Sequence, residues 1–441
     1  MPAVGRKENE TYVNSWKMEP LALAVLAALT PTDIEVKFFD DRLESIPYDE
    51  PTDLVAINAE TYTAKRAYQI SSQFRKRKVP VILGGYHPTL MPEEAGEYAD
   101  SVVVGEAEKL WPKLIDDVKK NRLQKIYRSV QRPLLNDIKP RRDIFEGKKY
   151  LPLALVESAR GCRFSCNFCS ISSFFNQTYN PRPVSEVVTE IGCLGRKSIF
   201  LVDDNIIADP QRTKELFRAL IPLKINWISQ GTINIANDNE MLELMKKSGC
   251  LGLLIGFESL NKNNLTQMGK SWNTQNSNYE DVLKKISDYG IAVYATFIFG
   301  YDNDDEDSFK RTLEFALEQK FFLAAFNHLV PFPGTPLYDE LKKQGRLLYE
   351  KWWLDEKYRF GDVAFKPKHM SAQQLSQACF EARQKFYQFN AILKRGIDFK
   401  NNCKNLKMFV NFYLYNIFSQ KEVRKRQGLP LGEGLDSGRK K

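Results

Sequence analysis

Residues 158–169 read SARGCRFSCNFC and carry three of the seven cysteines of the chain, Cys162, Cys166 and Cys169. Thiolates are soft ligands that suit iron–sulfur clusters. Three of them on one short loop can hold three irons of a four-iron cluster, which leaves the fourth iron without a protein ligand. A typical electron-transfer ferredoxin instead uses four cysteines for each cluster. The spacing therefore predicts a cluster with one open iron that can bind a small molecule.

Two other uses of cysteine fit this chain less well. A structural zinc site normally has four ligands, often in two Cys-x2–4-Cys pairs, and no second pair exists here. A disulfide framework is typical of short secreted chains with an even number of cysteines, whereas this chain has 441 residues and seven cysteines. We expect the isolated cysteines to pack as small core residues. They are Cys193, Cys250, Cys379 and Cys403.

The composition is that of an ordinary soluble globular protein, and the length is enough for about two or three domains. No segment approaches the ~20 apolar residues that span a bilayer, and free thiols suit a reducing compartment, so we expect a cytoplasmic protein. The net charge is +9, and part of it lies in residues 421–426 and 439–441, which we expect to form a solvated basic tail. Such a tail can also favour anionic membrane surfaces, which leaves membrane association open.

Residues 1–125 alternate between apolar strands and helices, which predicts a Rossmann-like α/β domain with a parallel sheet. The expected strands are 34–39, 54–58, 79–83 and 101–104, and the expected helices are 20–29 and 64–76. In such sheets ligands bind beyond the carboxyl ends of the strands, and glycines there let a large flat ligand approach the backbone. The candidate binding residues near these ends are Thr63, Gly84, Gly85, His87, Gly105 and Glu106.

Residues 150–345 follow a linker at 126–149 and contain six further strand–helix units. The strands are expected at 153–157, 198–202, 226–230, 250–256, 292–299 and 324–329. The helices are expected at 183–193, 210–220, 239–248, 279–289, 305–319 and 337–344. Six units fit a partial (β/α)6 barrel, in which chemistry takes place at the carboxyl ends of the strands. The cysteine loop follows the first of these strands, as such a barrel requires.

The cysteine loop, with Phe168 directly before its last cysteine, resembles the cluster-binding loop of the radical S-adenosylmethionine (SAM) superfamily. The resemblance implies that Cys162, Cys166 and Cys169 hold a [4Fe-4S] cluster whose open iron chelates SAM. It also implies reductive cleavage of SAM to a 5′-deoxyadenosyl radical, with electrons from a flavodoxin- or ferredoxin-type donor.

By the same resemblance, residues at other strand ends of the barrel would contact SAM. Asp203 and Asp204 follow the second strand, where a carboxylate can accept hydrogen bonds from the SAM amino group. Glu258 and Ser259 follow the fourth strand, where Glu258 suits the ribose hydroxyls. Gly300 follows the fifth strand and permits close approach of the adenosine. Each of them could instead be an ordinary residue at an exposed strand end.

The N-terminal segments resemble the cobalamin-binding domain that precedes many radical SAM domains. The turn GGYHP at 84–88 and the segment VGEAE at 104–108 carry this resemblance. Methionine-synthase-like domains have a histidine that ligates cobalt from below, whereas the matching loop at 40–45 reads DDRLES. Any bound cobalamin is therefore expected to lack a histidine ligand at this loop. The alternative is a domain that has lost cobalamin and only supports the barrel.

The start of the chain departs from that family. Such domains open with an apolar strand that leads into a Pro-rich turn, whereas residues 1–5, MPAVG, resemble only the end of the turn. We therefore expect the first sheet to lack a strand that is normally central, through a late start or a truncation.

Residues 346–441 depart from the strand–helix repeat, and we expect a mostly helical C-terminal region. The stretches WWLDEKYRF at 352–360 and FKPKHM at 365–370 resemble the tail of one cobalamin-dependent branch, to which hopanoid C-2 methylases and chlorin side-chain methylases belong. The aromatic residues could cover an apolar substrate or close the barrel as core residues. A hydrophobic helix near 409–418, flanked by lysines, could lie on a membrane surface or dock on the protein.

Together these resemblances imply a cobalamin-dependent radical SAM enzyme, best interpreted as a C-methyltransferase. One SAM would methylate cobalamin, and a radical from a second SAM would activate a substrate carbon to take the methyl group. The expected substrate is a small apolar molecule, a polycyclic lipid or a tetrapyrrole. No nucleic-acid partner is expected, because the sequence shows no RNA-binding appendage. The alternatives are a radical SAM cyclase or oxidoreductase without methyl transfer, and a non-catalytic cobalamin or cluster sensor.

Overall fold

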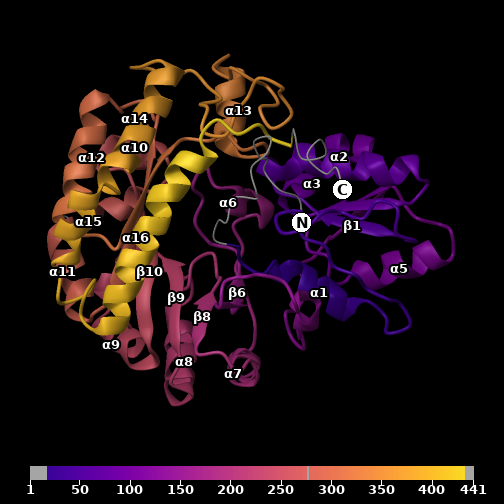
Figure 1. Cartoon of the computed structure of the whole chain (residues 1–441), viewed down its shortest axis with the longest axis horizontal. Coiled ribbons are helices and arrows are strands. Elements are labelled where there is room, and N and C mark those ends of the chain that lie inside the picture. Colours follow the sequence, from indigo (N-terminus) through magenta and orange to yellow (C-terminus); the bar gives the residue numbers. More distant parts are fainter. Residues whose placement is uncertain (1–16, 276–277, 433–441) are drawn as a thin grey trace.

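The computed structural model describes residues 17–275 and 278–432 of the chain. Two α/β units lie side by side, and the C-terminal helices pack against the outside of the second unit (Figure 1). The N-terminal turn at 1–5 and the basic residues 439–441, on which two of the sequence-based predictions rest, lie outside the described residues.

The first unit is a parallel four-stranded sheet. Its strands are, in order, β1 (Val55–Asn58), β2 (Val81–Gly84), β3 (Ser101–Val104) and β4 (Ile126–Arg128). Four helices cover its two faces: α2 (Ala64–Lys76) and α4 (Pro92–Tyr98) on one, and α1 (Leu21–Leu29) and α5 (Trp111–Lys119) on the other. The buried apolar side chains form a separate cluster on each face, as expected for a Rossmann-like layer architecture.

Two predictions for this unit are wrong. β4 lies at the start of the segment predicted as a linker, and it was missed because only Tyr127 of its three residues is buried. Residues 34–39, predicted as a strand, form no strand and pair with none in the described residues. Their exposure nevertheless alternates from Ile34 to Lys37 as in a strand, which is the pattern that produced the prediction.

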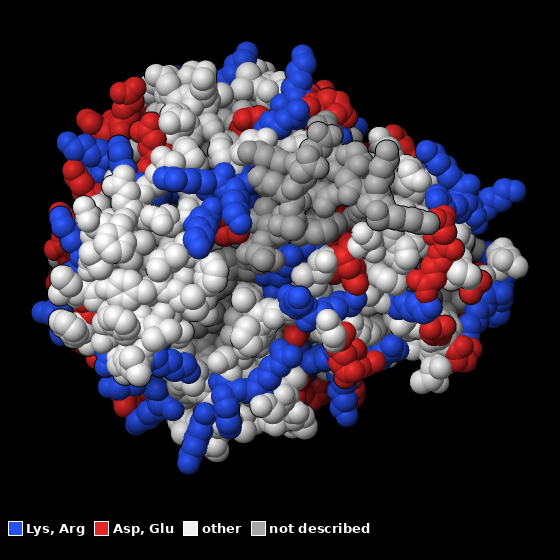
Figure 2. Space-filling model, in the orientation of Figure 1, with Lys and Arg blue, Asp and Glu red and all other residues white. Residues whose placement is uncertain are grey.

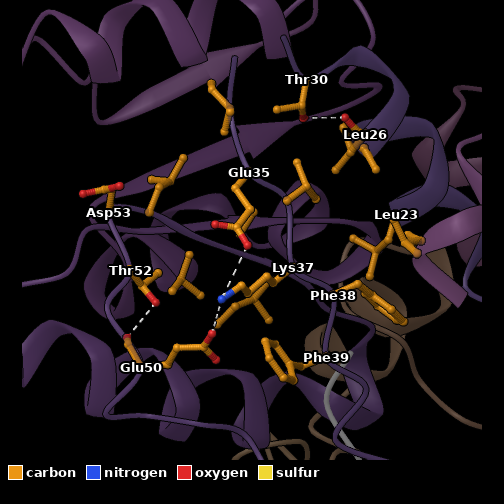
Figure 3. Close-up of a pocket in the computed structure, with 18 of the residues that line it drawn as sticks. Leu23, Leu26, Thr30, Glu35, Lys37, Phe38, Phe39, Glu50, Thr52 and Asp53 are labelled. Atoms are coloured by element: carbon orange, nitrogen blue, oxygen red, sulfur yellow. Dashed lines mark hydrogen bonds and ion pairs between the residues drawn. The ribbon is translucent and has the colours of Figure 1, made fainter. Parts of the chain in front are cut away.

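A cavity of about 470 Å³ lies between residues 34–39 and β1 (Figure 3). Its walls are largely apolar and come from both helical layers, with Leu23 and Leu26 on one side and Phe74 on the other. Ala56, in the middle of β1, is exposed at this edge. Strands of parallel sheets are normally buried on both faces and read as apolar runs. We infer that the cavity has the lining that one further apolar strand would need.

Filling this cavity with polypeptide should stabilise the fold. A chain with an apolar strand such as Lys-Val-Leu-Leu-Ile-Val fused ahead of Met1 is expected to unfold several degrees above the parent chain. The reason is that each newly buried aliphatic side chain contributes about 1.5–3 kcal/mol. Thermal unfolding followed by circular dichroism measures the effect. A Gly-Ser extension of the same length is the control, and equal melting temperatures for the two extended chains would contradict the inference.

The second unit is a six-stranded parallel sheet that follows the chain order. Its strands are β5 (Ala154–Val156), β8 (Ser198–Leu201), β9 (Asn226–Gly231), β10 (Cys250–Glu258), β11 (Ala292–Phe299) and β12 (Leu323–His328). The helices that alternate with them are α7 (Val184–Cys193), α8 (Pro210–Leu220), α9 (Asn239–Ser248), α11 (Tyr279–Asp288), α12 (Glu306–Glu318) and α13 (Pro336–Lys343). Every predicted strand and helix of this unit is present, with ends within two residues of the prediction. The predicted partial (β/α)6 barrel is confirmed.

The strands of this unit and the helices packed against them form the largest apolar cluster among the described residues. Cys250 and Cys379 are buried in it, as predicted for isolated cysteines. The same prediction is wrong for Cys193, which is exposed, and for Cys403, which is half-buried. The exposed thiol of Cys193 lies at the end of α7, outside the cysteine loop.

The C-terminal region is mostly helical, as predicted. It contains α14 (Ala372–Phe386), α15 (Phe389–Gly396) and α16 (Leu406–Arg426). Residues 421–426, expected as part of a solvated tail, form the last turns of α16 instead. Among the described residues, no helix combines the length and the apolar character needed to cross a membrane.

The aromatic segment before these helices completes the core of the first unit. Trp352 and Trp353 are fully buried in the cluster that α2 and α4 form with the first sheet. The indole N–H of Trp353 donates to Glu94 at 2.8 Å, and that of Trp352 donates to the backbone carbonyl of Pro331 at 2.9 Å. Trp352 and Trp353 are therefore core residues of the first unit and do not close the barrel. Phe365 is fully buried in the apolar cluster of the barrel beside Gly300, as expected for a core residue.

Candidate cluster and cofactor site

A pocket of about 420 Å³ lies where the carboxyl ends of the two sheets face each other. The first unit contributes one side of α1, Gly84 at the end of β2, Gly85 and Tyr86 after it, and Gly105 and Glu106 after β3. The second unit contributes the segments that follow its first two strands, together with the short helix α6 (Ser170–Phe174) behind the cysteine loop. The residues it supplies are Glu157, Arg160, Phe174, Phe175 and Val202. Binding at this edge is what both a Rossmann-like sheet and a barrel predict.

The start of the cysteine loop is fixed by glycine. Gly161 has a positive φ of 87°, and a Cβ there would lie 2.1 Å from the carbonyl oxygen of Thr178. Its backbone N–H donates to the Asp204 carboxylate at 2.6 Å. Asp204 thus anchors the residue directly before the first cysteine, and only glycine fits that turn.

The middle of the loop is held by Asn167, which lies between the second and third cysteines. Its backbone N–H donates to the Met268 carbonyl at 3.0 Å, and its carbonyl accepts the backbone N–H of Leu337 at 3.0 Å. Its side-chain oxygen accepts the Tyr301 hydroxyl at 2.8 Å. The loop is therefore fixed against segments that follow β10, β11 and β12.

The three thiols form a donor set that fits an iron–sulfur cluster. Cys166 is buried and Cys162 and Cys169 are half-buried. Burial raises the pKa of Cys162 and raises that of Cys166 to about 12, against the opposing charge of Lys270. Metal binding would therefore release protons from these thiols.

No group of three or more His, Cys, Asp or Glu residues in the described part of the chain is arranged to hold a single metal ion. The charges of the three cysteines nevertheless act on one another. A four-iron cluster spreads its ligands over several irons and so holds them further apart than one ion does. Three thiols on one loop that influence one another electrostatically therefore suit a cluster better than they suit zinc.

Arg160 joins the two units directly before the cysteine loop, a role that the sequence analysis did not recognise. Its guanidinium donates to Glu157 of its own unit at 2.7 Å. It also donates to Glu106 of the first unit at 3.2 Å and forms an ion pair with Glu108. Arg132 pairs with Glu106 as well, at 2.7 Å. The position of an arginine beside the Gly-Cys turn was the one signal for this role in the sequence.

Glu258 and Lys270 form a second charged pair, near Cys166. The Glu258 carboxylate accepts the Lys270 ammonium at 2.8 Å, and both side chains are almost fully buried. Glu258 has φ +61°, which is rare for a residue other than glycine and is found preferentially at functional sites. The Lys270 ammonium also lies 5.2 Å from the centre of the Trp272 ring. Lys270 was not predicted, because nothing local in its sequence indicates a partner twelve residues earlier.

The other predicted SAM residues are engaged within the protein. Asp203 accepts the backbone N–H of Ser158 at 2.7 Å and also the Ser158 hydroxyl. The Ser259 hydroxyl accepts the backbone N–H of Asn261 at 3.1 Å. Gly300 has φ +112°, and a Cβ there would lie 2.7 Å from Leu375. Phe168 is half-buried and packs against the barrel core.

The structure separates the residues predicted to bind cobalamin into two groups. Gly84, Gly85, Gly105 and Glu106 line the pocket, whereas Thr63 and His87 do not. The Thr63 hydroxyl donates to the Glu60 carbonyl and caps a short helix. The His87 ring is fully buried, with Nε2 at 3.0 Å from Glu94 and Nδ1 at 3.3 Å from Thr61.

The pocket suits a large flat ligand without a histidine ligand. No histidine is among the described residues that line it. The loop at 40–45 presents no free ligand either, because its first two carboxylates are buried in ion pairs. Asp40 pairs with Arg42 at 2.6 Å, and Asp41 pairs with Arg66 at 2.9 Å. The glycine backbone at the ends of β2 and β3 therefore lets a ligand approach closely. The loop at 40–45 supplies no free metal ligand.

Comparison with known proteins agrees with this geometry. Residues 17–115 match the B12 binding domain and residues 156–316 match the Radical SAM superfamily. The chain is 32% identical to bacteriochlorophyllide d C-12(1)-methyltransferase of Chlorobaculum tepidum over 91% of this chain and 89% of that protein. The chain belongs to the cobalamin-dependent radical SAM family. It is a radical SAM C-methyltransferase whose cofactors are a [4Fe-4S] cluster, SAM and cobalamin.

Two further similarities extend this result. Hopanoid C-2 methylase of Rhodopseudomonas palustris is 27% identical over 86% of this chain and 73% of that protein. The solved structure of the cobalamin-dependent SAM radical enzyme OxsB, with aqua-cobalamin and SAM bound, has a TM-score of 0.67 at 15% identity. It covers 92% of this chain and 69% of that one. The structural likeness supports the two-unit fold.

The buried Asp203 should make stability depend on pH. Burial raises the pKa of Asp203 to about 6 from 3.8. The native state therefore binds more protons than the unfolded state between these values, so the free energy of unfolding falls as pH rises from about 4 to about 6. Asp203→Asn should remove roughly 2–3 kcal/mol of that decrease.

Urea denaturation of the metal-free protein at several pH values measures this dependence. Asp53→Asn, at an exposed position, is the matched control and should leave the pH profile unchanged. Parallel profiles for the parent chain and Asp203→Asn would contradict the argument.

Proposed function

We propose that this enzyme methylates an unactivated carbon of an apolar polycyclic molecule, of the tetrapyrrole class in the first instance. The observation that carries the proposal is the shared pocket, to which the carboxyl ends of both sheets contribute. Around it, Tyr86, Phe174 and Phe175 pack ring against ring, with Tyr86 and Phe174 centroids 4.6 Å apart. Aromatic walls of this kind suit a flat, apolar substrate. The relatives named above act on a chlorin and on a polycyclic lipid.

We assign the cofactors to this chain as follows. Cys162, Cys166 and Cys169 would hold the cluster. Glu258, with Lys270, would bind SAM, since the pair offers both charges to a zwitterionic ligand. Further SAM contacts are assigned to Phe168, Asp203, Asp204, Ser259 and Gly300. The glycine backbone at 84, 85 and 105, with Glu106, would support cobalamin.

When bound, these groups supply one-electron cleavage of SAM and a transferable methyl group. The protein's own contribution is placement and exclusion of water. Arg160 fixes the first unit over the cysteine loop through Glu106 and Glu108. Asp204 and Asn167 fix the loop itself. The aromatic wall keeps water from the reacting carbon, which matters because radicals are quenched by side reactions in an open site.

We further propose a flavodoxin- or ferredoxin-type electron donor and work at a membrane surface. A low-potential donor is the class of partner that a reductively activated cluster requires. An apolar substrate partitions into lipid, so an enzyme that docks on a membrane meets it at a higher local concentration.

The function is tested on protein purified and reconstituted without oxygen, with hydroxocobalamin, dithionite and SAM carrying a deuterated methyl group. With a chlorin substrate we expect 5′-deoxyadenosine, S-adenosylhomocysteine and a product heavier by one labelled methyl group in place of hydrogen. Alanine at Cys162, Cys166 or Cys169 should lower iron content and reduce product by at least ~10³-fold, since the cluster has no substitute for its ligand set. Cys193→Ala, at the exposed isolated cysteine, should retain full activity.

The products distinguish the alternatives. Formation of 5′-deoxyadenosine with an altered substrate that has gained no methyl group would replace methyl transfer by cyclisation or oxidation. A bound cluster and cobalamin without SAM turnover for any chlorin or polycyclic lipid would favour a sensor. Equal activity in the cysteine variants and in the parent chain would overturn the assignment of the cluster.

A further inference from the structure

Exposed apolar side chains are concentrated on the outer side of α15 and α16. Ten of the fourteen large apolar side chains that are exposed in the described residues lie between positions 389 and 418. They are Phe389, Leu393, Ile397, Phe399, Leu406, Phe409, Val410, Leu414, Ile417 and Phe418. Phe399, between the helices, and Leu406, the first residue of α16, are 77% and 78% exposed. We call this set the apolar face.

The same segment carries most of the net positive charge of the molecule. Residues 389–426 contain nine Lys or Arg and two Asp or Glu, a net charge of +7 out of the +9 of the whole chain. Seven of these nine cations have no ion-pair partner among the described residues. Arg395 and Lys404 donate to backbone carbonyls, and the other five are Lys394, Lys407, Lys421, Arg424 and Lys425. Figure 2 shows a broad uncharged area over the position of α15 and α16 in Figure 1, with basic side chains at its borders.

The exposure of this face is not a sign of poorly packed helices, because their inner side is well anchored. Buried Arg395 donates to the carbonyl oxygens of Phe321 and Phe386 at 2.8 and 3.0 Å, and to the Asn416 side chain at 2.9 Å. Phe412 packs edge-on against Phe322 of the barrel, with centroids 5.4 Å apart. The helices therefore have a complete buried side, and the apolar face is additional surface.

Spacing makes the face continuous along α16. Leu406, Val410, Leu414 and Ile417 recur at intervals of three and four residues, so they share one side of the helix. Monomeric soluble proteins rarely expose large contiguous apolar patches unless the patch binds something. Helices with apolar side chains on one side and lysines beside them typically lie in the plane of a membrane surface.

We propose that the apolar face docks on an anionic lipid surface, with the apolar side chains at the headgroup boundary and the unpaired cations on the phosphates. A second copy of the chain is disfavoured as the occupant, because a two-fold interface would place this +7 segment against itself. The inference rests on the surface alone and stands whether or not methyl transfer does. Under the proposed function it would place the enzyme beside an apolar substrate.

Flotation of the intact protein with phosphatidylcholine vesicles, with and without phosphatidylglycerol, tests the proposal. We expect binding to the vesicles that contain phosphatidylglycerol, and weaker binding at high salt. The variant Leu406→Gln/Val410→Gln/Leu414→Gln should bind about tenfold or more weakly, and so should Lys407→Glu/Lys421→Glu/Lys425→Glu.

The matched control is Val130→Gln/Leu134→Gln/Leu348→Gln, which removes three exposed apolar side chains elsewhere and should bind like the parent chain. Circular dichroism confirms that each variant is folded. Three results would overturn the proposal: no binding to either vesicle, equal loss in the control variant, or dimers in light scattering that the α16 variants dissociate. Binding only to an acidic electron-donor protein, abolished by the lysine variant, would also overturn it and assign the face to that partner.

Discussion

Arg160 pairs with carboxylates of both α/β units and stands two residues before the first cysteine of the loop. A buried ion pair adds little net stability, because desolvation offsets most of its Coulomb energy. Its effect here is geometric, since one guanidinium ties Glu106 and Glu108 of the first unit to Glu157 of the second. That arrangement places the glycine turns of the first sheet over the cysteine loop of the second. The shared pocket, and every role assigned to its walls, depends on it.

Within residues 17–275 and 278–432, apolar surface is concentrated in two places that the described chain leaves open, and each has a physical explanation. The cavity beside β1 has apolar walls from both helical layers and an exposed Ala56 at the open strand edge. The apolar face on α15 and α16 has a charged border and an anchored inner side. In the first place, the edge of β1 offers backbone groups to which a further strand could hydrogen-bond. The second offers no such edge and suits a lipid surface.

Much of the fold could be predicted because its signals are local. The six strand–helix units of the barrel alternate between apolar runs and amphipathic segments, and the cysteine spacing lies in one short stretch. The role of Arg160 could not be predicted, because its partners in the first unit lie far away along the chain. The role of Lys270 could not be predicted, because its pair with Glu258 is significant only when both side chains are known to be buried. His87 was predicted to bind cobalamin for a related reason. Its position after two glycines suggested a ligand, but the chain turns its ring inward to Glu94. Trp353 was placed wrongly because its partner, Glu94, lies in the other unit.

The central claim is that cobalamin in the pocket between the two units lies next to the cluster on the cysteine loop. Pulsed electron paramagnetic resonance on the reconstituted protein, with the cluster reduced and cobalamin in its paramagnetic cob(II) form, measures it directly. The account predicts a dipolar coupling between the two spins that is lost when Cys166 is replaced by alanine. Two uncoupled signals from fully loaded protein would contradict it, because the two cofactors would then not lie side by side at the junction that Arg160 holds together.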